Sequence, residues 1–449
     1  MKLSTWACAW VMTGCLLMGD AMAQQLRHPV SVQPAGFDYN RYLQDEASPS
    51  DAPAPVAEGT ANHAPVVHTS SLSASCDTGC DTECDSGCDS GCDSCCSTSC
   101  VADWCDLGDA FTISECLFGE CSPWTAGGWV QAGYTSESTG LFNNLPGQVY
   151  LNQSWAYLER EADGACGWDW GFRADILYGT DGSDTQAFGN QSGNWDYENG
   201  FDHGDYSWAI PQLYGVLQNG DLSVKLGHFY TTIGYEVVGA PDNFFYSHAY
   251  TMYNSEPFTH TGALATYTVS DNLEVYGGWT AGWDTGFDQV DGGSNFLGGF
   301  SAALMDDLTL IYITTIGDFG WRGEDGYMHS IVLDATLTDN LNYVFQSDYL
   351  RVASTGEDNV GINQYLFYTV SDCVAVGSRV EWWKTDPLIN GEDLISVYEA
   401  TFGVNVRPHA NLIVRPEIRK NWAPSSKADA AVYDGVNDTI FGIDAIVTF

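Results

Sequence analysis

Cysteine is the residue type whose spacing in this sequence most plainly indicates a chemical role. From residue 76 the tetrapeptide Cys-Asp-x-x recurs, and more cysteines follow. In an exported chain this density favours disulfides, and an odd number leaves one thiol for a cross-link between molecules. Zinc sites favour C-x2-C pairs, so the C-x3-C spacing is a weaker match to a metal site, and a spacer with no further role is a third interpretation. The eleven disulfide or cross-link candidates are Cys76, Cys80, Cys84, Cys88, Cys92, Cys95, Cys96, Cys100, Cys105, Cys116 and Cys121.

The charged residues are the second set that could have a chemical role, because acidic residues far outnumber basic ones. The 449 residues include 15 Lys and Arg against 59 Asp and Glu, which gives a formal net charge of −44. Such a surface repels nucleic acid, so a nucleic-acid partner is excluded. Aromatic residues make up 13% of the chain, whereas a disordered acidic protein has few of them. Most of the chain is therefore expected to fold.

The first 123 residues are expected to be positioned outside the main fold. Residues 1–23 have the features of a secretory signal peptide, with Lys2, an apolar run and small residues Ala21 and Ala23 before the cleavage site. The apolar run is too short for a membrane helix. Residues 24–123 are rich in Pro, Ala and Ser and then in Cys-Asp repeats, a composition that predicts disorder.

From Trp124 onward the sequence alternates between apolar and polar residues in segments of about 9 to 13 residues, the length of a tilted membrane strand. In the segment 168–178, tryptophan and aliphatic residues share one face, and Arg173 and Asp175 share the other. Short turns such as 270–272 alternate with long polar loops, which is typical of up-and-down barrels. The terminal segment ends on Phe449, as barrel strands often do. The sequence predicts an all-β, antiparallel, up-and-down transmembrane β-barrel of about 16 strands over residues 124–449.

The long loop at 231–258 is the third of the long connections and carries three acids, Glu236, Asp242 and Glu256. Long loops without regular structure are usually functional. Strand alternation directs five basic residues into the lumen, namely Arg173, Lys225, Arg379, Arg415 and Arg419. Facing sets of opposite charge would create a transverse field that sets ion selectivity. The alternatives are ordinary ion pairs that stabilise the wall, and a loop that packs over the rim or against a neighbouring molecule.

Three stretches around this loop carry a family resemblance: 227–236 (GHFYTTIGYE), 240–248 (APDNFFYSH) and 256–262 (EPFTHTG), followed by the strand 272–283. With them the region from Trp124 to Phe449 resembles the putative beta-barrel porin 2 (OmpL-like) family. The resemblance implies an outer-membrane channel of a Gram-negative-type envelope, with no cofactor and no catalytic residues. By likeness to sixteen-strand porins, the loop 231–258 would fold inward and narrow the pore. The cysteine-rich segment lies outside the resemblance.

The expected function is passive diffusion of ions and small hydrophilic solutes, with a cation preference because a confined acidic lumen enriches cations. Expected partners are outer-membrane lipid, the outer-membrane assembly machinery and, by analogy, further copies of the chain. The N-terminal segment would be periplasmic. One alternative is a barrel that serves as a surface anchor or envelope cross-linking protein; a less favoured one is a secreted β-rich protein that acts on glycans through paired carboxylates.

Two acidic clusters in the long loops raise the question of Ca²⁺, which takes several oxygen ligands. No Ca²⁺-loop spacing is present, so solvated acidic loops are the favoured interpretation. The clusters comprise Asp181, Asp184, Asp196, Glu198, Asp202 and Asp205 in one loop, and Asp284, Asp288 and Asp291 in another.

Overall fold

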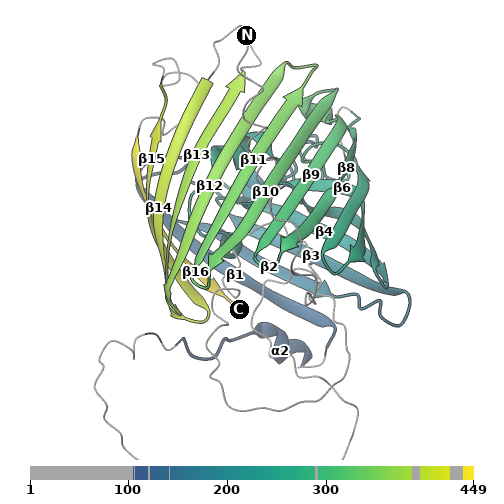
Figure 1. The fold of residues 1–449 in the computed structure, drawn as a ribbon, viewed down its shortest axis with the longest axis horizontal. Helices are drawn as coiled ribbons and strands as arrows, with labels where there is room; N and C mark the ends of the chain where they lie inside the picture. Colours follow the sequence, from purple (N-terminus) through teal and green to yellow (C-terminus); the bar gives the residue numbers. More distant parts are fainter. Residues whose placement is uncertain are drawn as a thin grey trace, which may run out of the picture.

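The computed structural model describes residues 105, 107–119, 122–140, 142–288, 292–386, 395–424 and 438–449. The expected signal peptide and the Cys-Asp repeats lie outside these described residues. Sixteen antiparallel strands form one closed barrel in which sequence neighbours pair and β1 pairs with β16 (Figure 1). The predicted fold is confirmed. The strands are β1 (Trp124–Thr135), β2 (Val149–Arg160), β3 (Asp169–Gly179), β4 (Ser207–Asn219), β5 (Leu222–Tyr230), β6 (Thr259–Ser270), β7 (Leu273–Thr280), β8 (Ser294–Met305), β9 (Leu308–Asp318), β10 (Gly326–Thr338), β11 (Leu341–Val352), β12 (Glu357–Ser371), β13 (Val374–Asp386), β14 (Ile395–His409), β15 (Leu412–Trp422) and β16 (Thr439–Thr448).

The two ends of the barrel differ in the length of their connections. One end, here called the turn end, carries the short turns, of which 220–221, 271–272 and 306–307 are examples, together with the C-terminus. The other, the loop end, carries the longer connections, among them L2 (180–206), L3 (231–258) and L4 (281–293). Short helical elements are α3 (Gly182–Thr185) in L2, η3 (Ala240–Asp242) and α4 (Tyr250–Ser255) in L3, and η4 (Gly320–Arg322) between β9 and β10. L3 is thus the third long connection, between β5 and β6, where the alternation of the sequence placed it.

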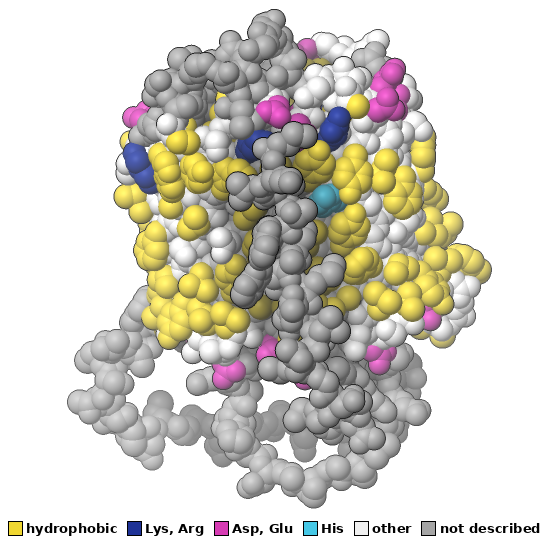
Figure 2. Space-filling view, turned by 45° about the horizontal axis from the view of Figure 1, so that its top comes forward, with side chains coloured by type: hydrophobic (Ala, Val, Ile, Leu, Met, Phe, Trp, Pro, Cys, Tyr) yellow, Lys and Arg dark blue, Asp and Glu magenta, His cyan; other side chains and the backbone are white. Residues whose placement is uncertain are grey.

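Alternation along each strand separates an apolar outer face from a polar inner face. In β3, Trp170 and Ile176 are 49% and 42% exposed, whereas Arg173 and Asp175 are buried on the lumen side. Figure 2 shows the result as a broad belt of hydrophobic side chains around the visible outer face, with acidic side chains near its two edges. Among the described residues, no helix has the length and apolar character needed to span a membrane.

The chain that precedes β1 is attached to the turn end at two places. Cys105 forms a disulfide with Cys373 in the turn between β12 and β13, with 5.5 Å between the Cα atoms. The side chain of Asn411 in the next turn accepts a hydrogen bond from Phe111 N at 2.7 Å and donates one to Phe111 O at 2.8 Å. The short helix α2 (Ile113–Phe118) follows and contacts β1 (Figure 1). The ordered chain therefore begins before residue 124, because the turns supply partners that composition alone did not reveal.

Candidate functional site

L3 crosses the lumen from β5 and β6 to the opposite wall. It contacts side chains of β11 to β16 and also of β1 and β2; examples are Arg379 on β13, Glu417 on β15 and Gln153 on β2. The alternative of a loop packed over the rim does not describe this geometry. Irregular backbone at membrane depth is tolerated only where its N–H and C=O groups find partners within the protein. The wall must therefore supply those partners.

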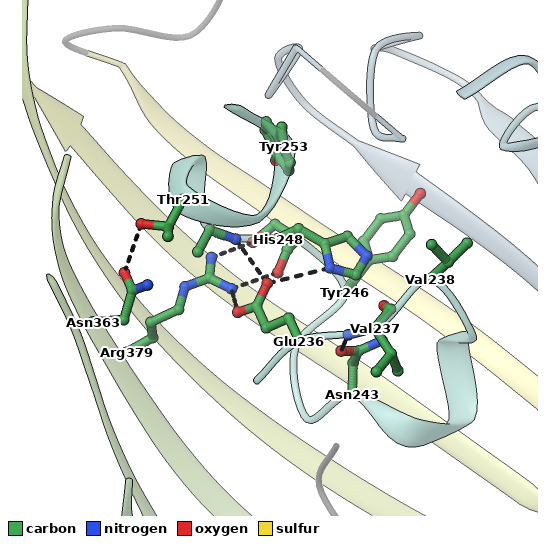
Figure 3. Close-up of polar contacts among 12 residues, drawn as sticks. Glu236, Val237, Val238, Asn243, Tyr246, His248, Thr251, Tyr253, Asn363 and Arg379 are labelled. Atoms are coloured by element: carbon green, nitrogen blue, oxygen red, sulfur yellow. Dashed lines mark hydrogen bonds and ion pairs between the residues drawn. The ribbon is translucent and has the colours of Figure 1, made fainter. Parts of the chain in front are cut away.

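Glu236 is the centre of the contact between L3 and the wall (Figure 3). One carboxylate oxygen accepts hydrogen bonds from Arg379 Nη1 at 2.7 Å and from the Tyr365 hydroxyl at 3.1 Å. The other accepts from Ala249 N at 2.8 Å and lies 3.2 Å from His248 Nδ1. Burial alone would raise the pKa of Glu236, but Arg379, His248 and Ala249 N–H together lower this pKa to about 2. The carboxylate is thus held ionised and fully bonded.

Arg379 is fully buried and divides its donors between L3 and its own wall. Its Nε donates to Glu399 at 2.7 Å, while Nη1 donates to Glu236 and to the carbonyl of Ser247, each at 2.7 Å. Figure 3 shows the guanidinium pointing from the strand into the loop. The guanidinium is therefore neutralised by two carboxylates, and its geometry is that of an anchor for L3.

Two wall carboxylates bind backbone N–H groups of the loop. Glu417 on β15 accepts hydrogen bonds from the successive N–H groups of residues 246–247, at 2.9 and 3.1 Å. Glu381 on β13 does the same for residues 250–251, at 2.7 and 2.6 Å, where α4 begins. The first N–H groups of a helix have no partner within it, so this carboxylate caps α4 from across the lumen.

Two further arginines bind carbonyl groups of the loop. Arg415 donates to Ala240 O at 2.8 Å and forms an ion pair with Asp444 on β16. Arg419 donates to His248 O. The three predicted arginines on β13 and β15 and the loop acid Glu236 are thus brought together, as strand alternation suggested. Arg379 forms an ion pair with Glu236, and all three arginines donate hydrogen bonds to carbonyl groups of L3.

Glu256 lies at the end of α4 and is buried against β11. It accepts a hydrogen bond from Gln346 Nε2 at 2.6 Å and lies beside Asp348. Burial, together with the charge of Asp348, raises the pKa of Glu256 well above its usual value. Gly234, at a φ of +90°, packs directly on this carboxylate, and an added Cβ would overlap it. Glu256 therefore contributes less negative charge to the lumen than its residue type suggests.

Asp242 and Lys225 differ from the other predicted pore residues because both remain only half-buried. Lys225 on β5 lies with its ammonium 4.5 Å from the centre of the Tyr214 ring. Asp242 lies on L3 in η3. Arg173, by contrast, is buried between Glu159 and Asp175, at 2.9 and 2.8 Å. The other six candidates are all buried.

Sequence reasoning missed the contribution of β1 and β2. Gln153 Nε2 donates to Val238 O at 2.8 Å, and its Oε1 accepts from Ala240 N at 3.1 Å. Trp129 Nε1 donates to the same Oε1 at 2.8 Å and thereby orients the amide. A polar residue on the lumen face, such as Gln153, was the available signal, but its partner lies 85 positions away.

The acidic loops at the loop end use their carboxylates for loop packing. Asp284 in L4 accepts hydrogen bonds from Phe258 N and Thr259 N at 2.6 and 3.0 Å, which fixes the end of L3. Burial raises its pKa to about 6, and burial likewise raises the pKa of Asp196 in L2 to about 6. In the described part of the chain, no three His, Cys, Asp or Glu residues form a group that could hold a metal ion, and Asp291 lies outside that part.

The described cysteines occupy the turn end. Cys105 is paired with Cys373, whereas Cys116 in α2 and Cys166 in the turn after β2 are free thiols and exposed. Nothing in the local sequence of Cys373 points to a partner 268 positions earlier. The remaining candidates lie outside the described residues: Cys76, Cys80, Cys84, Cys88, Cys92, Cys95, Cys96, Cys100 and Cys121.

Several solved outer-membrane barrels are similar to this chain. The outer membrane channel DcaP of Acinetobacter baumannii is 9% identical and covers 73% of this chain and 97% of its own, with a TM-score of 0.50. An anion-selective porin from Comamonas acidovorans is 11% identical over 73% and 99% of the two chains, with a TM-score of 0.49. OmpT of Vibrio cholerae is 13% identical over the same shares, with a TM-score of 0.47. At 9% identity the likeness to DcaP concerns the fold alone.

No curated protein matches the sequence. A family model, described as putative beta-barrel porin-2, OmpL-like, matches residues 123–449, which is more than half of the chain and includes the entire barrel with L3. The chain belongs to this family of outer-membrane β-barrel porins.

Proposed function

We propose that the protein is a passive diffusion channel for ions and small hydrophilic solutes, and that L3 forms its constriction. The observation that carries the proposal is the course of L3 across the lumen, where Glu381, Glu417 and Arg379 hold its backbone. Family membership supports an outer-membrane channel in general. A loop that served only as surface decoration would not require buried charges of the wall for its attachment.

The orientation follows from the two unlike ends. Outer-membrane barrels have short periplasmic turns and longer external loops. The turn end, with the disulfide between Cys105 and Cys373, is therefore placed in the periplasm, and L2 to L4 are placed outside. This orientation keeps the cysteine-rich segment in an oxidising compartment.

The channel is proposed to prefer cations. The argument rests on the charges near the lumen and its entrance and not on the net charge of −44 of the whole chain. Glu236 is paired with Arg379, which also pairs with Glu399, and the charge of Glu256 is suppressed by burial. Asp242 on L3 and Lys225 on the wall are half-buried, and their charges act in opposite directions on a permeating ion. The excess acidic charge of the loops at the entrance adds to the effect of Asp242, because a confined opening concentrates counter-ions.

The test is the reversal potential of the refolded protein in a planar lipid bilayer under a salt gradient. Discrete conductance steps with a cation-selective potential are expected. Anion preference would leave the channel in place and contradict the charge argument. A folded barrel, shown by a heat-dependent shift in gel mobility, that gives no conductance would contradict the channel itself.

A second candidate function, a barrel that anchors a cross-linking segment, is favoured by one observation. The disulfide between Cys105 and Cys373 fixes the chain just before β1 covalently to the turn end. The free thiols of Cys116 and Cys166 are exposed at the same end. Non-reducing gels of isolated envelopes discriminate the two functions: a ladder of species that collapses on reduction supports cross-linking. A single monomeric band with full conductance supports the channel alone.

A further inference from the structure

Two carboxyl groups meet where the last part of L3 lies against the barrel wall. Glu256 at the end of α4 is 3% exposed, and Asp348 on the lumen face of β11 is 1% exposed. The two side chains are within hydrogen-bonding contact of each other. Two ionised carboxylates in contact and out of water would repel each other strongly. The contact is therefore stable only if at least one of the two carboxyl groups carries a proton.

The hydrogen-bond donors around this acid pair, Glu256 and Asp348, are too few for two carboxylates. Gln346 Nε2 donates to Glu256 Oε1 at 2.6 Å, and Ser330 Oγ donates to Asp348 Oδ1 at 2.6 Å. Asp348 Oδ2 is buried, and no N–H or O–H group of the residues that the structure describes donates to it. A single proton held between the two carboxyl groups supplies a donor, because one carboxyl then donates and the other accepts.

The charged groups around the acid pair do not neutralise it. Glu236, the other acid of L3 that acts on Glu256, adds to the repulsion. The neighbouring guanidinium groups are bound to other carboxylates, Arg379 to Glu236 and Arg322 to Glu357. Arg322 also binds a carbonyl group in α4 and so lies close to the pair without serving it. A proton is therefore the positive charge that the acid pair can use.

The two attachments of L3 need opposite protonation states. Glu236 is held by Arg379 as a carboxylate, whereas Glu256 is held against Asp348 as an acid. Burial and the charge of Asp348 raise the pKa of Glu256 well above its ordinary value of 4.5. A group whose pKa is raised by folding contributes fully below its ordinary pKa, and the contribution is lost as the pH rises through the raised value. The attachment at Glu256 should therefore weaken on the alkaline side, where the attachment at Glu236 remains intact.

We propose that Glu256 and Asp348 share a single proton, and that loss of this proton to solvent releases the C-terminal limb of L3, residues 250–258, from β11. Ionisation of the pair places two like charges in contact, and separation of the limb from the wall lets both carboxylates reach water. A wider passage beside β10 and β11 follows from this release. That effect on conductance rests on the proposed function of L3 as the constriction, whereas the shared proton does not.

The shared proton is tested by infrared spectroscopy of the full-length refolded protein at about pH 8, where isolated carboxyl groups are ionised. The C=O stretch of a protonated carboxyl differs in frequency from that of a carboxylate. Wild type should show one such band that Glu256→Gln lacks and that Asp348→Asn lacks equally. The double variant should lose no more than either single variant, because the proton is common to both groups. The matched control is Asp306→Asn, which removes an exposed carboxyl at the turn end and should retain the band.

The release of the limb is tested by hydrogen exchange of residues 250–258 as the pH is raised. Wild type is compared with Glu256→Gln at each pH, which cancels the chemical effect of pH on exchange. Above the raised pKa of Glu256, the equilibrium constant for docking of the limb should fall about tenfold per pH unit in wild type, since one proton is lost. Glu256→Gln should not change, because its amide cannot ionise and can still donate to Asp348. Mean conductance should increase over the same pH range in wild type alone.

Each outcome bears on the proposal. Absence of the infrared band, or loss of two separate bands in the double variant, would overturn the shared proton. A band that persists while exchange stays constant up to the pH at which the barrel unfolds would overturn the release, as would an equal rise in Glu256→Gln. Retained heat-dependent gel mobility shows that each variant is folded. A protein that shows the band and the release but gives no conductance would reject the channel and retain this inference.

Discussion

Replacing Glu236 with glutamine tests whether L3 is held by its buried ion pair. The pKa of Glu236 is lowered from 4.5 to about 2 in the folded protein, which corresponds to about 3 kcal/mol of favourable interaction with the ionised form. Glutamine keeps the shape but removes the charge that Arg379 and Ala249 N–H bind. The docked state of L3 should therefore be weakened by about 3 kcal/mol, which raises the undocked population roughly a hundredfold.

Two measurements check this expectation. Hydrogen exchange of residues 236–256 should accelerate in Glu236→Gln, and single-channel traces should become noisier with a larger mean conductance. The matched control is Lys225→Gln, which removes a half-buried charge from the wall outside L3 and should leave exchange of the loop unchanged. Unchanged exchange and conductance in Glu236→Gln would refute the assignment of the ion pair as the anchor of L3.

The same anchor has a defined pH dependence. Because the folded pKa of Glu236 lies below its ordinary value, its contribution is present above about pH 4.5 and is lost as the pH falls through about 2. Wild-type L3 should therefore loosen between these values. Glu236→Gln should lack this component of the transition, and an identical acid response in both proteins would contradict the assignment.

Further predictions concern selectivity, the loop end and the turn end. Asp242→Asn should shift the reversal potential toward anions and Lys225→Gln toward cations, by comparable amounts; shifts of the same sign would contradict the assignment of both residues to the pore. Asp284 has a pKa raised from 3.8 to about 6, so its contribution is present at low pH and is lost as the pH rises through about 6; limited proteolysis of L3 should increase over that range, and Asp284→Asn should remove the dependence. Cys373→Ser should lower stability by about 2–4 kcal/mol and release residues 107–119 to protease, an effect that reduction of the wild type should reproduce.

Much of the barrel could be predicted because the environment of each strand is reflected in the alternation of its own neighbouring residues. A strand that faces lipid on one side and a lumen on the other must alternate, so β3 is recognisable from Trp170, Arg173 and Asp175 alone. The turn residues that join strands at the turn end are equally local. The position of L3 follows from its length and from the alternation on either side of it.

The partners of the site were not predictable in the same way. Alternation directs Glu381, Glu417 and Arg379 into the lumen, but it does not say that they bind backbone groups 130 or more positions away. The types of these side chains were compatible both with a field across the pore and with ordinary ion pairs, and only the structure shows that Glu236 pairs with Arg379 and that Glu381 binds the start of α4. Cys373 shows the same limit, since its disulfide partner precedes the barrel.

The attachment of L3 also constrains the order in which the molecule can assemble. The loop leaves β5, yet its backbone is bound by β13 and β15, which are the later strands along the chain. Contacts of such long sequence separation form late, since the entropy of closing the intervening chain must first be overcome. Until β15 is in place, Glu417 cannot bind residues 246–247, and L3 has no complete set of partners. A barrel in mid-assembly therefore has an unattached L3, and the contacts of this loop with β13 and β15 are among the last to form.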